Sequence, residues 1–190
     1  MRKLMMTMTL ALSVIFIGHE GAEASTVHDT QAGESLWIVA NQYGVSMNEL
    51  KELNNKIEDH LDIGESLVIP VTITDDEKQL LAQLVTAEAK GEPYAGQVAV
   101  ATVVLNRVKS DEFPNSIRGV IYEDRQFTPV SNGTINQPAT ESAKRAVNEA
   151  LAFQGLGNGS LFFYNPETAT NHWNAQRQET IRIGNHVFAK

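Results

Sequence analysis

The sequence predicts an α+β protein in two parts: a small strand–helix–helix–strand (βααβ) unit, then a larger, mainly helical domain with a short β-hairpin region near its end. Apolar residues recur at helical spacing through most of the chain, and alternating strand-like stretches flank the small unit and close the large one. Charge also separates the parts, because residues 26–70 carry eight acidic and two basic residues, whereas residues 75–190 carry thirteen and eleven. We therefore place a linker at residues 71–76.

The first 24 residues have the pattern of a secretory signal peptide. A basic start precedes an apolar run at residues 4–18, and Ala22–Ala24 forms an A-x-A cleavage site. The alternative is a retained membrane anchor, for which the apolar run is short. We expect cleavage before Ser25, a secreted mature chain, and no membrane partner after cleavage.

Composition excludes several classes of function. The chain contains no cysteine, so it forms no disulfide and uses no thiol nucleophile. Its formal net charge is −8 and it has no basic run, which argues against a nucleic-acid partner. Nothing in the sequence indicates an oligomer, and we expect a monomer.

The small unit consists of four short elements. Gly33 breaks a first strand, and Gly44 stops the first helix, whose apolar side chains share one face. The second helix begins with Ser46 and Glu49 in the spacing of a capping box. The stretches are TVHDT (26–30), SLWIVANQYG (35–44), SMNELKELNN (46–55) and SLVIP (66–70).

Residues 26–70 resemble a LysM domain over nearly their whole length. The resemblance is carried by G-E-S-L-W-x-x-A, Y-G-V-S, E-L-x-x-L-N-N and the closing G-x-x-L-x-I-P. It implies binding of glycans that contain N-acetylglucosamine, including peptidoglycan. It also implies a groove between two loops, which here are Ala32–Leu36 and Asn54–Ile63.

The first helix of the larger domain carries a glutamate on its apolar face. Thr74 and Glu77 have capping-box spacing, and Gly91 is expected to end the helix. Glu88 follows the apolar stripe at helical spacing and falls in the last turn. A carboxylate on such a stripe is expected to have a raised pKa and to hold a proton near neutral pH, as a general acid must. The alternative is a rim position at which Glu88 pairs with Arg107, Lys90 or a backbone amide. The stripe consists of Leu81, Leu84 and Val85.

The remaining elements follow in order. Helices are predicted over residues 94–110 and 137–153, with a short helix at 113–124 between them. LFFYNP (161–166) reads as a strand, in which we interpret Phe162 and Phe163 as core residues. TIRIGNHVFA (180–189) reads as a hairpin that turns at Gly184-Asn185.

Residues 77–189 resemble the cell-wall hydrolases typified by the spore cortex-lytic enzymes SleB and CwlJ. The resemblance rests on LVTAEAKGEP, FPNSIRGVIY, QFTPVSNGTI, LFFYNPETAT and IRIGNHVF, in that order. It implies that residues 77–190 form a catalytic domain with the lysozyme-like fold of lytic transglycosylases. It also implies that the glutamate of the A-E-A-[RK]-G-E-P motif, here Glu88, is the catalytic acid.

The same resemblance implies which residues contact the glycan. Gln126 and Asn165 would bond to acetamido or hydroxyl groups, and Phe127 and Tyr164 would stack on sugar faces, unless these aromatic rings are core residues. Trp173 matches a tryptophan of the family, although the residues after it depart from the family pattern.

The resemblance implies a lytic transglycosylase that needs one glutamate and forms a 1,6-anhydro end. The closest alternative is a hydrolytic muramidase that uses Glu88, a water, and Glu92 or Asp124 as base. We interpret Glu92 as a solvated loop residue, and Glu123 and Asp124 as solvated turn residues. A wall-binding protein without activity is the non-enzyme alternative.

Other hydrolase chemistries lack their motifs. There is no H-E-x-x-H and no serine-nucleophile motif, and we expect neither a metal nor a cofactor. The sequence therefore predicts a secreted enzyme, associated with the cell wall or spore envelope, whose partner is the peptidoglycan glycan strand. Spore cortex is one substrate to consider, and the sequence does not distinguish it from the vegetative wall.

Overall fold

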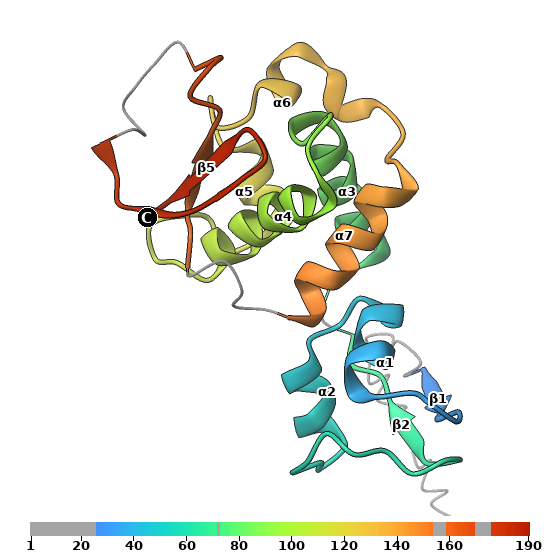
Figure 1. Cartoon of the computed structure of the whole chain (residues 1–190). Coiled ribbons are helices and arrows are strands. Elements are labelled where there is room, and N and C mark those ends of the chain that lie inside the picture. The colour runs from blue at the N-terminus through green and yellow to red at the C-terminus, as the bar shows by residue number, and fades with distance from the viewer. Residues whose placement is uncertain (1–25, 72, 154–158, 170–175) are drawn as a thin grey trace, which may run out of the picture.

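The computed structural model describes residues 26–71, 73–153, 159–169 and 176–190, which form two parts (Figure 1). The expected signal peptide, residues 1–24, lies outside the described residues. Within the described ranges, no helix is long and apolar enough to cross a membrane.

The N-terminal unit (residues 26–70) has the predicted βααβ order. Strands β1 and β2 pair antiparallel, with His28 opposite Leu67. The side chains of Ser35 and Ser46 accept hydrogen bonds from backbone N–H groups and cap the two helices, and Gly44 ends the first helix in the left-handed conformation. The elements are β1 (Val27–Asp29), α1 (Leu36–Tyr43), α2 (Met47–Leu53) and β2 (Ser66–Val68).

The C-terminal domain is built around one buried helix, α4. Apolar side chains are buried on several sides of this helix, and α3, α5 and α7 pack against it (Figure 1). Helix α3 begins at Asp75 behind the predicted capping box of Thr74 and Glu77, inside the range expected for the linker. The helices are α3 (Asp75–Glu88), α4 (Tyr94–Val108), α5 (Ile117–Tyr122), α6 (Thr128–Asn132), the 3-10 helix η1 (Thr134–Asn136) and α7 (Glu141–Ala152).

A three-stranded antiparallel sheet closes this domain. The strand order is β3-β5-β4, with β3 at Phe162–Tyr164, β4 at Glu179–Ile183 and β5 at His186–Ala189. Strands β4 and β5 form the predicted hairpin, and Gly184 at its turn has φ of 57°. The prediction of the hairpin and of its turn is therefore confirmed.

Glu92 ties this hairpin to the start of α4, and the interpretation of Glu92 as a solvated loop residue was wrong. Its side chain is buried, and its two carboxylate oxygens accept hydrogen bonds from the backbone N–H and the side-chain amide of Asn185, at 2.9 and 3.0 Å. Both oxygens are thus occupied by one residue of the hairpin turn. A buried carboxylate with this bonding holds structure together.

The two parts of the chain share helix α7. Most of its buried side chains belong to the core of the C-terminal domain, but Ala152, its last residue, packs in the core of the N-terminal unit. Next to it, the rings of Trp37 and Phe153 lie 6.0 Å apart. Figure 1 shows the end of α7 reaching the N-terminal unit. The two cores therefore meet at one helix end.

Polar contacts add to this junction. The ammonium group of Lys78 on α3 donates to the backbone carbonyl of Tyr43 at 2.7 Å, and burial lowers the pKa of Lys78. Gly44 lies against Asn148 of α7 so closely that a Cβ atom at Gly44 would be 2.5 Å from the Asn148 side-chain oxygen. The absence of a side chain at Gly44 thus permits the close approach of the two parts.

We expect Gly184→Ala to destabilise the C-terminal domain by about 1 kcal/mol for its left-handed backbone plus about 1–3 kcal/mol for overpacking. The added Cβ would collide with the Glu92 carboxylate and lie 2.7 Å from Cδ of Pro93. Gly133→Ala is the matched control, because Gly133 also has a positive φ but has open space around it. Urea unfolding measures the stability of both variants. Equal losses of stability would contradict the close packing of the hairpin turn against Glu92.

We expect the junction to appear in a double-mutant cycle of Gly44→Ala and Asn148→Ala. Removing the Asn148 side chain makes room for the new Cβ, so the double variant should be more stable than the sum of the single effects by about 0.5–3 kcal/mol. The free energy of unfolding, followed by Trp37 fluorescence, measures this coupling. Additive effects would mean that the two parts do not pack together in solution.

Candidate active site

Glu88 is the last residue of α3 and lies where two cavities meet. The first has a volume of about 700 Å³ and the second about 490 Å³, and both are lined by Glu88 and Thr128. The end of the helix places the Glu88 carboxyl at this point. Helix α3 ends at its C-cap, Ala89, and Gly91, the predicted stop, turns the chain away with φ of 83°. The side chain thus stands at the centre of an extended concave surface.

The larger cavity combines a mainly apolar surface with several uncharged polar side chains. Its floor comes from the end of α3, and its walls come from α6, η1 and the start of α7. Hydroxyl and amide groups of this kind suit the hydroxyl and acetamido groups of a sugar. They include Thr86, Gln97, Asn132, Thr134, Gln137 and Thr140.

The smaller cavity has a different character, because it combines aromatic rings with charged groups. The rings come from Phe113, Phe127, Phe162 and Phe163. The interpretation of Phe162 and Phe163 as core residues is confirmed in part, since they also contribute to this lining. The charged residues beside Glu88 are Arg107, Glu112, Glu123, Arg125 and Arg177.

The environment of Glu88 favours the protonated acid. Burial raises the pKa of Glu88 to about 7, and the positive charge of Arg107 opposes this rise without cancelling it. Among the described contacts, Glu88 forms no ion pair with Arg107 or with the exposed Lys90. The alternative of a carboxylate neutralised by a direct partner is therefore not what the structure shows.

Arg107 is buried at the base of the smaller cavity and is held by three kinds of contact. Its Nε donates to the carbonyl of Leu161 at 2.7 Å, and its Nη1 donates to the side-chain oxygen of Gln126 at 3.2 Å. Burial lowers the pKa of Arg107 to about 10. Its guanidinium carbon also lies over three rings, at 4.7 Å from the centroid of Phe113, 5.3 Å from Phe127 and 5.4 Å from Phe162.

The predicted sugar contacts are distributed unevenly. Gln126 is exposed and Phe127 is buried, and both line the smaller cavity. Tyr164 and Asn165 are described but line neither cavity at Glu88, and the Asn165 side chain accepts a hydrogen bond from the backbone of Glu167. Their contact with sugar stays a prediction. Trp173 lies outside the described residues.

Sequence reasoning missed much of the larger cavity. Helix α6 and η1, which supply Thr128, Asn132 and Thr134, lie in QFTPVSNGTI, a stretch quoted as a motif without a predicted helix. Pro129 at the start of a helix was the available signal. Within the described residues, no cluster of histidine, aspartate and glutamate is arranged to hold a metal ion.

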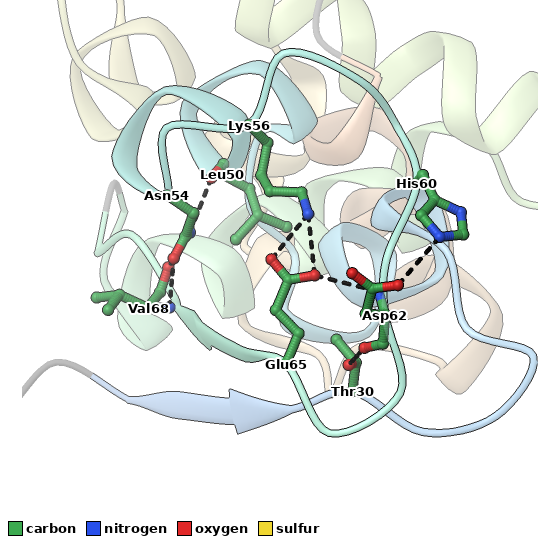
Figure 2. A network of polar contacts seen from close by, with 8 residues as sticks. All are labelled: Thr30, Leu50, Asn54, Lys56, His60, Asp62, Glu65 and Val68. Carbon is green, nitrogen blue, oxygen red and sulfur yellow. Dashed lines mark hydrogen bonds and ion pairs between the residues drawn. The ribbon is translucent and has the colours of Figure 1, made fainter.

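In the N-terminal unit, Thr30 binds the end of the second predicted groove loop and the two residues at 64 and 65. The Thr30 backbone N–H donates to Glu65 at 2.9 Å, its carbonyl accepts from Gly64 at 2.8 Å, and its hydroxyl donates to the carbonyl of Asp62. Figure 2 shows Lys56 bridging both carboxylate oxygens of Glu65, at 2.8 and 2.9 Å, inside the second loop. These contacts brace residues 54–65 against the first strand.

Asn54 fixes the other end of this loop. Its side-chain nitrogen donates to the carbonyls of Leu50 and Val68, both at 2.8 Å, and its oxygen accepts from the N–H of Val68 at 2.7 Å (Figure 2). Between the two anchors, Ile57 and Ile63 are 92% and 77% exposed. The loop therefore presents apolar side chains on a braced backbone.

Two family models match the chain. The LysM domain matches residues 28–70, and the Cell Wall Hydrolase model matches residues 91–189, which is more than half of the chain. The chain belongs to the cell wall hydrolase family. In this member of the family, the match begins at Gly91, just beyond Glu88, so the role of Glu88 depends on the geometry of the two cavities.

Individual proteins show the same similarity. A spore cortex-lytic enzyme of Halalkalibacterium halodurans is 44% identical over 131 residues, which cover 69% of this chain and 40% of that relative. The catalytic domain of the germination-specific lytic transglycosylase SleB from Bacillus anthracis is 44% identical with a TM-score of 0.60, and the match covers 64% of this chain and 100% of that domain. The catalytic domain of Bacillus cereus SleB matches with a TM-score of 0.59 at 44% identity, over 64% of this chain and 95% of that chain.

These comparisons confirm the fold class that the sequence predicts. The mainly helical C-terminal domain has the fold of the SleB catalytic domains, and the LysM match covers the βααβ unit. The chain spans less than half the length of the curated relative from Halalkalibacterium halodurans.

We expect Glu88→Gln to be more stable than the wild type above pH 7 and equally stable near pH 4.5. The pKa of Glu88 is raised in the folded state, so the folded protein holds this proton more tightly than the unfolded chain. The stabilisation by protonation is complete below about pH 4.5 and is lost as the pH rises to about 7. Urea unfolding at several pH values measures the difference.

Glu141→Gln is the control of opposite sign. A hydrogen bond from Lys144 lowers the pKa of Glu141, so this carboxylate stabilises the fold at high pH and its removal should cost stability there. If both variants changed with pH in the same direction, the buried acid at Glu88 would be contradicted.

Proposed function

We propose that this chain is a secreted peptidoglycan-degrading enzyme that cleaves the glycan backbone between N-acetylmuramic acid and N-acetylglucosamine as a lytic transglycosylase. The observation that carries the proposal is the position of Glu88, a carboxyl with a pKa of about 7 at the meeting point of two cavities. A general acid near neutral pH needs this protonation state, and a polymer needs room on both sides of the bond that breaks. The likeness to SleB catalytic domains supports the same reaction.

The proposed reaction uses Glu88 twice. Its carboxyl donates a proton to the glycosidic oxygen as the bond between C1 of muramic acid and that oxygen breaks. The resulting carboxylate then takes the proton of the C6 hydroxyl, whose oxygen attacks C1 and closes a 1,6-anhydro ring. The proton returns to Glu88, so no water is consumed and the enzyme is restored.

The two cavities would hold opposite ends of the substrate strand. Apolar surface with hydroxyl and amide groups lines the larger one, and aromatic rings, charged groups and Gln126 line the smaller one. Rings and neutral polar groups are common partners of sugars, because they match apolar sugar faces and hydroxyl edges. The side chains around Glu88 thus fit a carbohydrate on both sides of the acid.

Hydrolysis is the second candidate, and one observation keeps it open. A hydrolytic muramidase needs a base for water. Of the carboxylates considered from the sequence, Glu92 is bound to Asn185 and the side chain of Asp124 is 90% exposed. Glu123 lines the same cavity as Glu88, and it replaces Glu92 and Asp124 as the candidate base.

We further propose that the N-terminal unit binds glycan that contains N-acetylglucosamine and keeps the enzyme at the cell wall or spore envelope. The LysM match and the second loop, which is braced by Thr30 and Asn54, support this role. Spore cortex is the first substrate to test, because the matched relatives are named spore cortex-lytic enzymes. The proposal needs no metal, cofactor or partner subunit.

The experiment is digestion of purified vegetative and cortex peptidoglycan with residues 25–190, followed by mass spectrometry of the released glycans. We expect fragments that end in 1,6-anhydromuramic acid, and a loss of at least about 100-fold in their release by Glu88→Gln, because general acid catalysis contributes on that scale. Glu179→Gln is the control, because Glu179 is exposed and lines neither cavity, and this variant should release the same fragments.

Other products would change the assignment. Reducing muramic ends would establish water as the acceptor and make Glu123 the candidate base. If the wild type released no fragments from either wall, the chain would act as a binding protein.

A further inference from the structure

Glu123 occupies a position that the sequence did not indicate. It was interpreted as a solvated turn residue, but its side chain is half-buried and its Oε2 atom is buried without a hydrogen-bond partner among the described residues. It follows the end of α5 and lines the cavity that contains Glu88 and Arg107. By contrast, the neighbouring Asp124 is exposed, as expected.

The turn that carries Glu123 is fastened to Arg107. The backbone N–H of Gln126 donates to the carbonyl of Glu123 at 3.3 Å, and the side-chain oxygen of Gln126 accepts from Arg107 at 3.2 Å. Arg125, between them, has φ of 60°, which closes the turn tightly. Because Gln126 bonds to the backbone of Glu123 and to the guanidinium of Arg107, it links the turn that carries Glu123 to Arg107.

Arg107 therefore faces two carboxyl groups with different roles. The charge of Glu123 raises the pKa of Arg107 more strongly than the charge of Glu88 does, and Arg177 acts in the opposite direction. The other charged groups around Glu88 are Glu112 and Arg125 in the smaller cavity and Lys90 in the larger one.

We propose that Glu123 is a positioning residue that balances the charge of Arg107, so that Arg107 can organise the cleft without drawing the proton from Glu88. The inference rests on the proposed role of Glu88 as the acid. Its physical basis is that an uncompensated cation in a partly desolvated cleft stabilises the ionised form of the nearest carboxyl group. Glu123 offsets that effect by placing a formal negative charge in the same cavity as Arg107.

The balance also matters after the first proton transfer. Glu88 is then a carboxylate and must take a proton from the C6 hydroxyl. A net positive charge beside it would hold it in the ionised form and weaken it as a base. The pair of Arg107 and Glu123 has no net charge, so the same carboxyl group can give a proton and take one back.

The test is to follow the titration of Glu88 in residues 25–190 by NMR of the ¹³C-labelled carboxyl carbon. Glu123→Gln removes one negative charge, and we expect it to lower the titration midpoint of Glu88 by about half to one pH unit. Asp124→Asn is the matched control, since it removes the same charge one residue away on an exposed side chain. It should leave the midpoint within about 0.2 pH unit, as expected for a solvent-screened charge.

A second variant guards against a folding defect. Glu123→Ser removes the same charge with a smaller side chain, and its circular dichroism and its Glu88 midpoint should agree with those of Glu123→Gln. A midpoint that stays at the wild-type value in a folded Glu123 variant would overturn the proposal. An equal shift in Asp124→Asn would also overturn it, because the effect would then be one of net charge.

Turnover gives an independent reading. In Glu123→Gln, the decline of kcat/KM at high pH should begin at lower pH by the same amount, while the product ends stay the same. If the wild type releases no glycan fragments but the NMR midpoint shifts, the proposed function fails and the charge relation stands. If the wild type releases glycan fragments but the Glu88 midpoint is unshifted in Glu123→Gln, the proposed function stands and the proposed effect of Glu123 on Glu88 fails.

Discussion

The buried guanidinium of Arg107 is the constraint on which the cleft depends. A cation with almost no exposure must have its donors satisfied, and the side chain meets this need by bonding to two segments that are distant in sequence. One bond fixes the chain at Leu161, directly before β3, and the other fixes the turn at Gln126. The three phenylalanine rings around the guanidinium complete the enclosure. One residue of α4 thus sets the distance between the sheet and the loop that follows α5.

Glu88 gains its chemistry from its surroundings. The same glutamate on an exposed helix end would be ionised near neutral pH, and it would then be no acid. Here the apolar stripe of α3 carries it into the cleft, and Arg107, the cation that lowers its pKa, is bonded to other groups. The packing of α3 and the bonding of Arg107 together therefore favour the protonated form of the Glu88 carboxyl group.

The sequence predicted those features that follow from local patterns. The position of Glu88 followed from helical spacing, the hairpin at Gly184 followed from its Gly-Asn turn, and the βααβ order followed from caps and glycine stops. The cell wall hydrolase resemblance added the cleft residue Gln126. These signals all lie within one element, or between an element and its neighbour in the chain.

The features that the sequence did not predict depend on contacts between distant segments. Glu92 was interpreted as solvated because it lies beyond the end of the helix, but its partner, Asn185, belongs to the last hairpin. Glu123 looked like an ordinary turn residue because its burial comes from a cavity wall built by other elements. Periodicity reports which face of an element is apolar, but not which distant loop will cover a particular carboxylate.

The shared end of α7 limits how far the two parts of the chain can move relative to each other. If a flexible linker joined a binding module to a catalytic domain, the active site could reach every glycan strand within the length of the linker. Here Ala152 belongs to one core and most other buried residues of the helix belong to the other, so the N-terminal unit is held against the domain that carries Glu88. Under the proposed function, the place where the N-terminal unit binds the wall would then determine which neighbouring bond reaches Glu88. Regular meshes and disordered ones would consequently be cut to different extents by the same active site.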